Sequence, residues 1–164
     1  MATTFRVGIG YDIHRLAEGR RLVLGGVEID YPLGLLGHSD GDVVLHAVTD
    51  ALLGAAGLPD IGDLFPDTDP AYKDIDSREL LATAIEKVAE AGYAPNNIDL
   101  IVHAEKPKLS EHKGAMASSI ALLTGLGTSA VSVKAKTNEG LGPLGHADGI
   151  ACTATVSIVN KPKP

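Results

Sequence analysis

Apolar residues along this chain recur with two different periods, which predict a mixture of β-strands and α-helices. Alternating positions or short apolar runs indicate strands at residues 5–11, 22–24, 27–29, 98–104, 130–136 and 150–159. Apolar positions near a 3.6-residue period indicate helices at residues 40–56, 76–92 and 110–123. Polar residues with glycine or proline predict loops at residues 60–73 and 140–149.

The helix starts carry residues that can cap them. Asp76 and Glu79 have the spacing of a capping box, and Ser110 can cap the helix that follows it. The order of strands and helices predicts a single α+β domain, in which a mixed β-sheet has its helices packed on one face. We expect this domain to cover residues 1–160, with a frayed tail at residues 161–164.

Composition narrows the class of protein. Hydrophobic residues make up 45% of the 164 residues but aromatic residues only 4%, so the core must be mainly aliphatic. A formal net charge of −7 disfavours a nucleic-acid partner, which needs a basic face. No apolar run reaches the length of a membrane span, and the first residues do not form a signal peptide. The single cysteine, Cys152, cannot form an intrachain disulfide, so we expect a cytoplasmic protein.

The strongest candidate chemistry is a metal site. Asp12 and His14 are two residues apart at the end of a strand, so their side chains point to the same face. His46, on the following helix, can add a third ligand. One oxygen and two nitrogen ligands leave one position of a zinc tetrahedron open, as in catalytic sites. The alternative is an ordinary polar helix face, because an Asp-x-His pair alone also occurs by chance.

The helix that carries His46 also carries two candidate partners for it. Asp42 and Asp50 are four residues before and after His46, so all three lie on one helix face. A metal-bound histidine commonly donates its second ring N–H to a carboxylate. We therefore expect either Asp42 or Asp50 to orient His46.

Two loops between a strand and the next element can handle phosphate. Lys108 lies where a strand ends and a helix begins, and a helix N-terminus with a nearby lysine attracts anions. Lys136, Thr137 and Glu139 follow another strand, where Thr137 can donate to a phosphate oxygen and Glu139 can hold Mg²⁺. The alternative for both loops is an ordinary polar turn.

Together, these residues resemble the family of 2-C-methyl-D-erythritol 2,4-cyclodiphosphate synthases of the non-mevalonate isoprenoid pathway. The resemblance covers nearly the whole chain and is strongest at residues 10–14 (GYDIH), 34–42 (GLLGHSDGD), 46–56 (HAVTDALLGAA) and 60–70 (DIGDLFPDTDP). It implies a metal-dependent phosphorus–oxygen lyase. Such an enzyme cyclises 4-diphosphocytidyl-2-C-methyl-D-erythritol 2-phosphate and releases CMP, by attack of the 2-phosphate on the β-phosphate.

The resemblance also implies a partner and a set of site residues. It implies a homotrimer with active sites between subunits, and one Zn²⁺ per subunit on Asp12, His14 and His46. Glu139 would hold Mg²⁺ or Mn²⁺ with the substrate, while His38 and Thr137 would stabilise the transition state. The implied substrate-binding residues are His38, Ser39, Asp60, Ile61, Gly62, Phe65, Asp67, Asp69, Ala104, Lys108, Ser110, Lys136, Thr137, Asn138, Pro143 and His146.

The chain departs from the family pattern at two of these positions. His146 stands where an arginine is common, and Pro143 stands where an aromatic residue is frequent. In the family this region lines a central cavity of the trimer that can hold an anionic ligand. Without the fixed positive charge of an arginine, the resemblance implies anion binding in that cavity less strongly for this chain. Two other functions fit the same residues. One is a zinc-dependent phosphohydrolase that releases phosphate, and the other is a trimeric nucleotide- or isoprenoid-phosphate-binding regulator without turnover.

Overall fold

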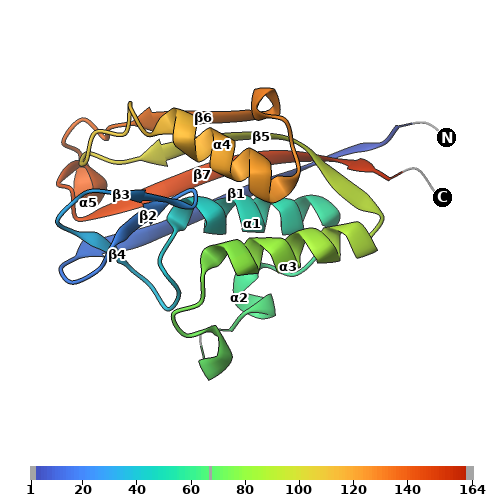
Figure 1. Cartoon of the computed structure of the whole chain (residues 1–164), viewed down its shortest axis with the longest axis horizontal. Helices are drawn as coiled ribbons and strands as arrows, with labels where there is room; N and C mark the ends of the chain where they lie inside the picture. The colour runs from blue at the N-terminus through green and yellow to red at the C-terminus, as the bar shows by residue number, and fades with distance from the viewer. Residues whose placement is uncertain (1–2, 67, 162–164) are drawn as a thin grey trace.

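The computed structural model, which describes residues 3–66 and 68–161, has one five-stranded sheet with helices packed against one of its faces (Figure 1). The strands are β1 (Phe5–Ala17), β2 (Leu22–Leu24), β3 (Val27–Ile29), β4 (Gly34–Leu36), β5 (Tyr93–His103), β6 (Val131–Lys136) and β7 (Gly149–Asn160). The helices are α1 (Val43–Ala56), α2 (Ile61–Leu64), α3 (Ser77–Glu90), α4 (Lys113–Thr124) and α5 (Gly142–Gly145), with 3₁₀ turns η1 (Pro70–Tyr72) and η2 (Thr128–Ala130).

The large sheet mixes parallel and antiparallel pairs. Its strand order is β4-β1-β7-β5-β6, where β5 and β6 are parallel and the other neighbours are antiparallel. The strands β2 and β3 form a separate hairpin. Helices α1, α3 and α4 lie on the same side of the large sheet in Figure 1. The prediction of one α+β domain with a mixed sheet and helices on one face is therefore confirmed.

Two glycines in β1 allow helix α1 to lie unusually close to the sheet. A Cβ atom on Gly8 would lie 2.0 Å from the carbonyl oxygen of Ala51, and one on Gly10 would lie 2.0 Å from that of Ala47. Because the strand alternates, the next residues on this face after Gly10 are Asp12 and His14. The close approach of α1 to β1 therefore determines how near His46 comes to those two side chains.

The N-terminus of α1 is fixed by Asp42. Its carboxylate accepts N–H groups of Val44 and Leu45 in the first turn of the helix, and also those of Gly25 and Gly26 in the hairpin. Asp42 is completely buried. One side chain thus caps the helix and ties it to the turn between β2 and β3.

Asp42→Ala should lower the free energy of unfolding by about 3 kcal/mol, because it removes a helix cap and leaves buried N–H donors without an acceptor. Urea denaturation followed by circular dichroism measures the loss. Asp76→Ala is the matched control, since Asp76 caps α3 at a more exposed site and its carboxylate accepts one backbone N–H, that of Arg78; it should cost about 1 kcal/mol. Equal losses in the two variants would contradict this account.

Several predicted boundaries differ from the structure. Strand β1 runs on to Ala17, so Asp12 and His14 lie within it and not at its end, because pairing with β4 and β7 extends it. The predicted loop at 60–73 contains α2 and η1, and α5 lies in the predicted loop at 140–149. The expected cap at Ser110 is wrong, because α4 begins at Lys113 with His112 in the cap position.

Some sequence predictions fall outside the described residues, namely Asp67 and residues 162–164 of the expected tail. Within the described residues, no helix combines the length and apolar character needed to span a membrane.

Candidate metal centre and substrate cavities

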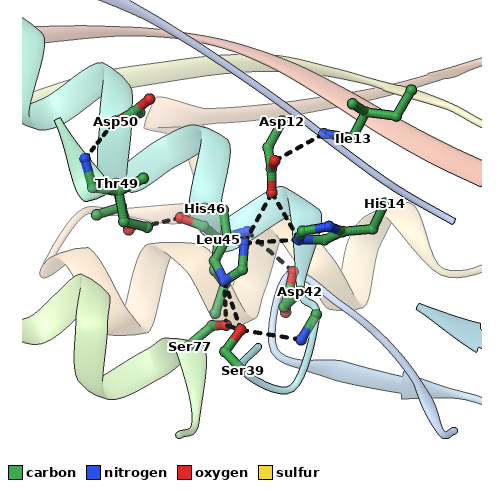
Figure 2. Close-up of polar contacts among 12 residues, drawn as sticks. Asp12, Ile13, His14, Ser39, Asp42, Leu45, His46, Thr49, Asp50 and Ser77 are labelled. Atoms are coloured by element: carbon green, nitrogen blue, oxygen red, sulfur yellow. Dashed lines mark hydrogen bonds and ion pairs between the residues drawn. The ribbon is translucent and has the colours of Figure 1, made fainter. Parts of the chain in front are cut away.

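Asp12, His14 and His46 come together between β1 and the first half of α1, as Figure 2 shows. Asp12 Oδ2 lies 3.1 Å from His14 Nε2 and 2.9 Å from His46 Nδ1. The two imidazole nitrogens are 3.2 Å apart. The prediction that these three side chains converge on one point is confirmed.

The spacing of these three atoms suits a small divalent cation. Ligands about 2.0–2.1 Å from a tetrahedral Zn²⁺ lie about 3.3 Å from each other, which matches the triangle of 2.9–3.2 Å. Three lone-pair donors this close need a proton or a cation between them. The donor set of one carboxylate and two imidazoles fits zinc, and three protein ligands would leave a fourth coordination position for another group.

The local charges favour an ionised carboxylate at this centre. Burial opposes ionisation of Asp12, but hydrogen bonds from His14 and His46 outweigh it and hold the pKa of Asp12 well below its usual range. Burial of His46 likewise opposes its charged form, yet the hydrogen bond and charge of Asp12 raise the pKa of His46. A negative carboxylate beside two imidazoles is the electrostatic arrangement of a cation site.

The predicted carboxylate partner of His46 is wrong. Asp42 points back to the N–H groups that it caps, and Asp50 accepts the N–H of Ile61 at 2.8 Å, at the start of α2. Figure 2 shows Asp50 directed away from the His46 ring. A helix spacing of four residues places side chains on one face but does not set their direction, and both carboxylates are occupied by backbone donors.

Hydroxyl groups take the place of that carboxylate. His46 Nε2 lies 2.8 Å from Ser77 Oγ and 3.0 Å from Ser39 Oγ. The Ser77 hydroxyl is in turn hydrogen-bonded to Oδ1 of Asp40. Ser77 was not among the predicted site residues, and its contact with His46 depends on how α3 packs against the segment before α1.

A cavity of about 560 Å³ opens beside the three candidate ligands. Of the predicted substrate-binding residues, those that line it are His38, Ser39, Asp60, Ile61, Gly62 and Phe65. The cavity is also lined by Tyr11 and Pro66, which lie in the motifs at residues 10–14 and 60–70, and by Tyr72, Ile75 and Leu80, which the sequence did not indicate. Ile75 and Leu80 lie near the start of α3. From the sequence alone, apolar residues that line a cavity there cannot be distinguished from apolar residues of the hydrophobic core. The rings of Phe65 and Tyr72 contact edge to face.

The segment that carries His38 and Ser39 is held by Arg20, another residue that the sequence did not indicate. The Arg20 guanidinium donates to the carbonyl oxygens of Ser39 at 2.7 Å and Leu35 at 3.1 Å. The backbone N–H of Asp74 donates to the carbonyl of His38 at 2.8 Å. These contacts fix the main chain of the segment while the His38 side chain lines the cavity.

A second cavity, of about 240 Å³, lies at the C-terminal ends of β5 and β6. Of the predicted residues, it is lined by Ala104, Lys108, Ser110, Lys136 and Thr137. Glu105 also lines it and lies within the stretch 104–110 that was expected to hold the nucleotide part, whereas Lys113, which lines it too, was not predicted. Glu105 Oε2 accepts the N–H of Asn138 at 3.1 Å, which joins the two predicted phosphate loops.

The remaining predicted residues lie outside the linings of both cavities: Asp69, Asn138, Glu139, Pro143 and His146. Asp69 caps the 3₁₀ turn η1 through the N–H of Ala71. Glu139 has a left-handed backbone with φ of 52° and accepts a hydrogen bond from the Thr137 hydroxyl. Its carboxylate is therefore next to the second cavity without lining it.

Comparison with known proteins agrees with this geometry. The model of the YgbB family matches residues 5–159. The chain belongs to the YgbB family. A protein of Bordetella petrii, named 2-C-methyl-D-erythritol 2,4-cyclodiphosphate synthase, is 61% identical over 158 residues, covering 96% of this chain and 98% of the relative.

Solved structures of family members have the same fold. One structure of a 2C-methyl-D-erythritol-2,4-cyclodiphosphate synthase aligns with a TM-score of 0.86 at 42% identity, over 93% of this chain and 99% of that one. A Plasmodium falciparum relative in complex with CDP aligns with a TM-score of 0.84 at 35% identity, over 99% of this chain and 100% of that one. The family resemblance inferred from the motifs is confirmed.

Proposed function

We propose that this chain is a cyclodiphosphate synthase that converts 4-diphosphocytidyl-2-C-methyl-D-erythritol 2-phosphate to 2-C-methyl-D-erythritol 2,4-cyclodiphosphate and CMP. The observation that carries this proposal is the triangle of Asp12, His14 and His46, which faces a cavity of about 560 Å³. Family relatives with this name match almost the whole chain. The phosphates of the substrate supply the anionic groups that such a centre would bind.

In this mechanism the chain orients the substrate and forms no covalent bond to it. The 2-phosphate attacks the β-phosphorus, and the bond to the α-phosphate oxygen breaks as CMP leaves, so the reaction needs positioning and charge stabilisation. Asp60, Ile61 and Gly62 lie where they would hold the methylerythritol part, against the ring of Phe65. When bound, Zn²⁺ would act as a Lewis acid on a phosphoryl oxygen, and Mg²⁺ or Mn²⁺ at Glu139 would offset phosphate charge.

The second cavity would hold the cytidine diphosphate part. Lys108, Lys136 and Lys113 offer positive charge at its lining, and the Thr137 hydroxyl would turn from Glu139 to donate to a phosphate oxygen. The complex of a relative with CDP supports a nucleotide in this family. His38 and Thr137 are our candidates for stabilising the charge that develops during ring closure.

We also propose that the active site forms between subunits of a homotrimer. The two cavities have no lining residue in common, so the groups proposed to bind the two ends of one substrate lie apart on one chain. The uncovered face of β1 carries a strip of apolar side chains with exposures between 46% and 72%: Phe5, Val7, Ile9, Tyr11 and Ile13. An exposed apolar strip of this length indicates a protein interface.

Light scattering coupled to size exclusion should give the mass of three chains of 16.9 kDa each. Ile9→Lys should lower that mass, because it places a charge in the middle of the strip, where Ile9 is 72% exposed. Leu122→Lys is the control, since Leu122 is 84% exposed on α4 and lies outside the strip. A wild-type protein with the mass of one chain would refute the trimer.

Glu139→Gln should raise the Mg²⁺ concentration for half-maximal turnover by about tenfold, because a lost charged contact costs about 1.5 kcal/mol. Turnover measured across a Mg²⁺ titration gives this value. Glu86→Gln, which makes the same change at an exposed position on α3, should leave the titration unchanged. A Glu139→Gln titration that overlays the wild type would count against the assignment.

The two rival functions give different products from the same substrate. A phosphohydrolase would release inorganic phosphate, and a binding regulator would release nothing. Our proposal predicts CMP in equal amount to the substrate consumed, which chromatography of the reaction mixture measures. Release of phosphate without CMP, or no product at all, would overturn it. We place the enzyme in the cytoplasm, in keeping with its single, free and buried cysteine.

A further inference from the structure

We propose that Asp40 and Ser77 are positioning residues that set the tautomer of His46 so that its Nδ1 lone pair is directed at the metal. This inference rests on the proposed metal centre and adds two residues to it. Three hydrogen bonds link the Asp40 carboxylate to the His46 ring through the hydroxyl groups of Ser77 and Ser39.

The carboxylate of Asp40 fixes the direction of the Ser77 hydroxyl proton. Asp40 accepts the N–H of Asp42 at 3.1 Å and that of Ser77 at 3.2 Å, and its Oδ1 also faces the Ser77 hydroxyl. An ionised carboxylate can only accept hydrogen bonds. The Ser77 hydroxyl must therefore donate its one proton to Asp40.

The two serine hydroxyl groups in turn fix which ring nitrogen of His46 carries the proton. With its proton on Asp40, Ser77 Oγ presents only lone pairs to His46 Nε2, at 2.8 Å. Ser39 Oγ, 3.0 Å from the same nitrogen, accepts the N–H of Gly41 and can direct its own proton to Ser77 Oγ, 3.5 Å away, which leaves a lone pair for Nε2. Nε2 must then carry a proton, and in a neutral imidazole Nδ1 is left bare. Nδ1 is the atom that faces Asp12 and His14.

Both serine hydroxyl groups that contact His46 Nε2 are buried, so water cannot readily replace them. Ser77 is completely buried and Ser39 is 6% exposed, so bulk water has little access to replace a lost acceptor. A backbone hydrogen bond holds Asp40 and Ser77 next to each other. The N–H of Asp40 donates to the carbonyl of Ile75 at 3.1 Å, which joins the segment before α1 to the start of α3. Without an acceptor at Nε2, His46 would lose both its orientation and its preferred tautomer.

Zinc affinity, measured by competition with a chromophoric chelator, tests the proposal. Ser77→Ala should weaken binding by about 10–100-fold, the usual effect of removing a partner of a metal-bound histidine. Asp40→Asn should weaken it by about tenfold or more, because an amide N–H facing Ser77 Oγ would turn the hydroxyl proton toward His46. Thr83→Ala is the control. It also removes a hydroxyl group from α3, but that hydroxyl donates to the backbone carbonyl of Glu79 and not to a histidine.

A ¹H–¹⁵N correlation spectrum of the histidine rings gives a second readout that a purely structural role would not produce. In zinc-loaded wild type, His46 should show a protonated Nε2 and a metal-bound Nδ1. A protonated Nδ1 with zinc on Nε2 would overturn the proposal, whether or not the variants fold. Wild-type affinity in folded Ser77→Ala and Asp40→Asn would also overturn it. A wild type that binds no zinc would instead refute the metal centre itself.

Discussion

His46→Ala should remove the bound zinc and lower CMP release by about 10³-fold. The variant keeps Asp12 and His14 but loses the nitrogen that lies 2.9 Å and 3.2 Å from their ligand atoms. Two ligands hold zinc poorly, and losing Lewis-acid stabilisation worth about 4 kcal/mol corresponds to about a thousandfold in rate. Metal analysis of the purified protein and a CMP-release assay measure the two effects.

His112→Ala is the control for His46→Ala, because it removes a histidine that lies in the cap position of α4, away from the metal centre. It should keep one zinc per chain and wild-type turnover. Full zinc occupancy with unchanged turnover in His46→Ala would show that the metal centre is assigned to the wrong residues.

Gly10→Ala should separate α1 from β1 and so damage both stability and the metal centre. Its Cβ would lie 2.0 Å from the carbonyl oxygen of Ala47 and 2.8 Å from the N of Ala51, and neither backbone atom can rotate away. We expect the free energy of unfolding to fall by about 3 kcal/mol or more, which urea denaturation measures. Zinc content should fall as well, because His46 moves with its helix.

Gly114→Ala is the matched control for that substitution. Gly114 lies in α4, and a Cβ built on it has no other atom within 4 Å. The same change there should leave the unfolding free energy unchanged or raise it by up to about 1 kcal/mol, since alanine favours helices. If Gly10→Ala were as stable as Gly114→Ala, the close approach of α1 to β1 would not constrain the fold.

The parts of the site that were predictable from sequence depend on local spacing. Asp12 and His14 share a strand face whatever the rest of the chain does, and His46 lies on a helix that must cover an apolar sheet. The convergence of these three residues could therefore be inferred from two periodic patterns. Four of the five strands of the large sheet were predictable for the same reason, whereas the short strand β4 was not predicted. Pairing with β4 and β7 also carried β1 further, to Ala17.

The parts that were not predictable depend on tertiary contacts between polar side chains. Asp42 and Asp50 have the spacing expected of partners for His46, but backbone donors of the hairpin and of α2 take their carboxylates. Ser77 and Asp40 meet only because α3 begins beside the segment before α1. Helix spacing constrains one element at a time, so partners contributed by other elements cannot be inferred from it.

The ³¹P NMR spectrum of a reaction mixture tests the central claim most directly. Wild-type protein with Zn²⁺, Mg²⁺ and 4-diphosphocytidyl-2-C-methyl-D-erythritol 2-phosphate should replace the substrate signals with two coupled signals of a cyclic diphosphate and one of CMP. Under the same conditions His46→Ala should leave the substrate signals in place. Appearance of inorganic phosphate without a cyclic diphosphate, or an unchanged spectrum with the zinc-loaded wild type, would contradict the proposed cyclisation.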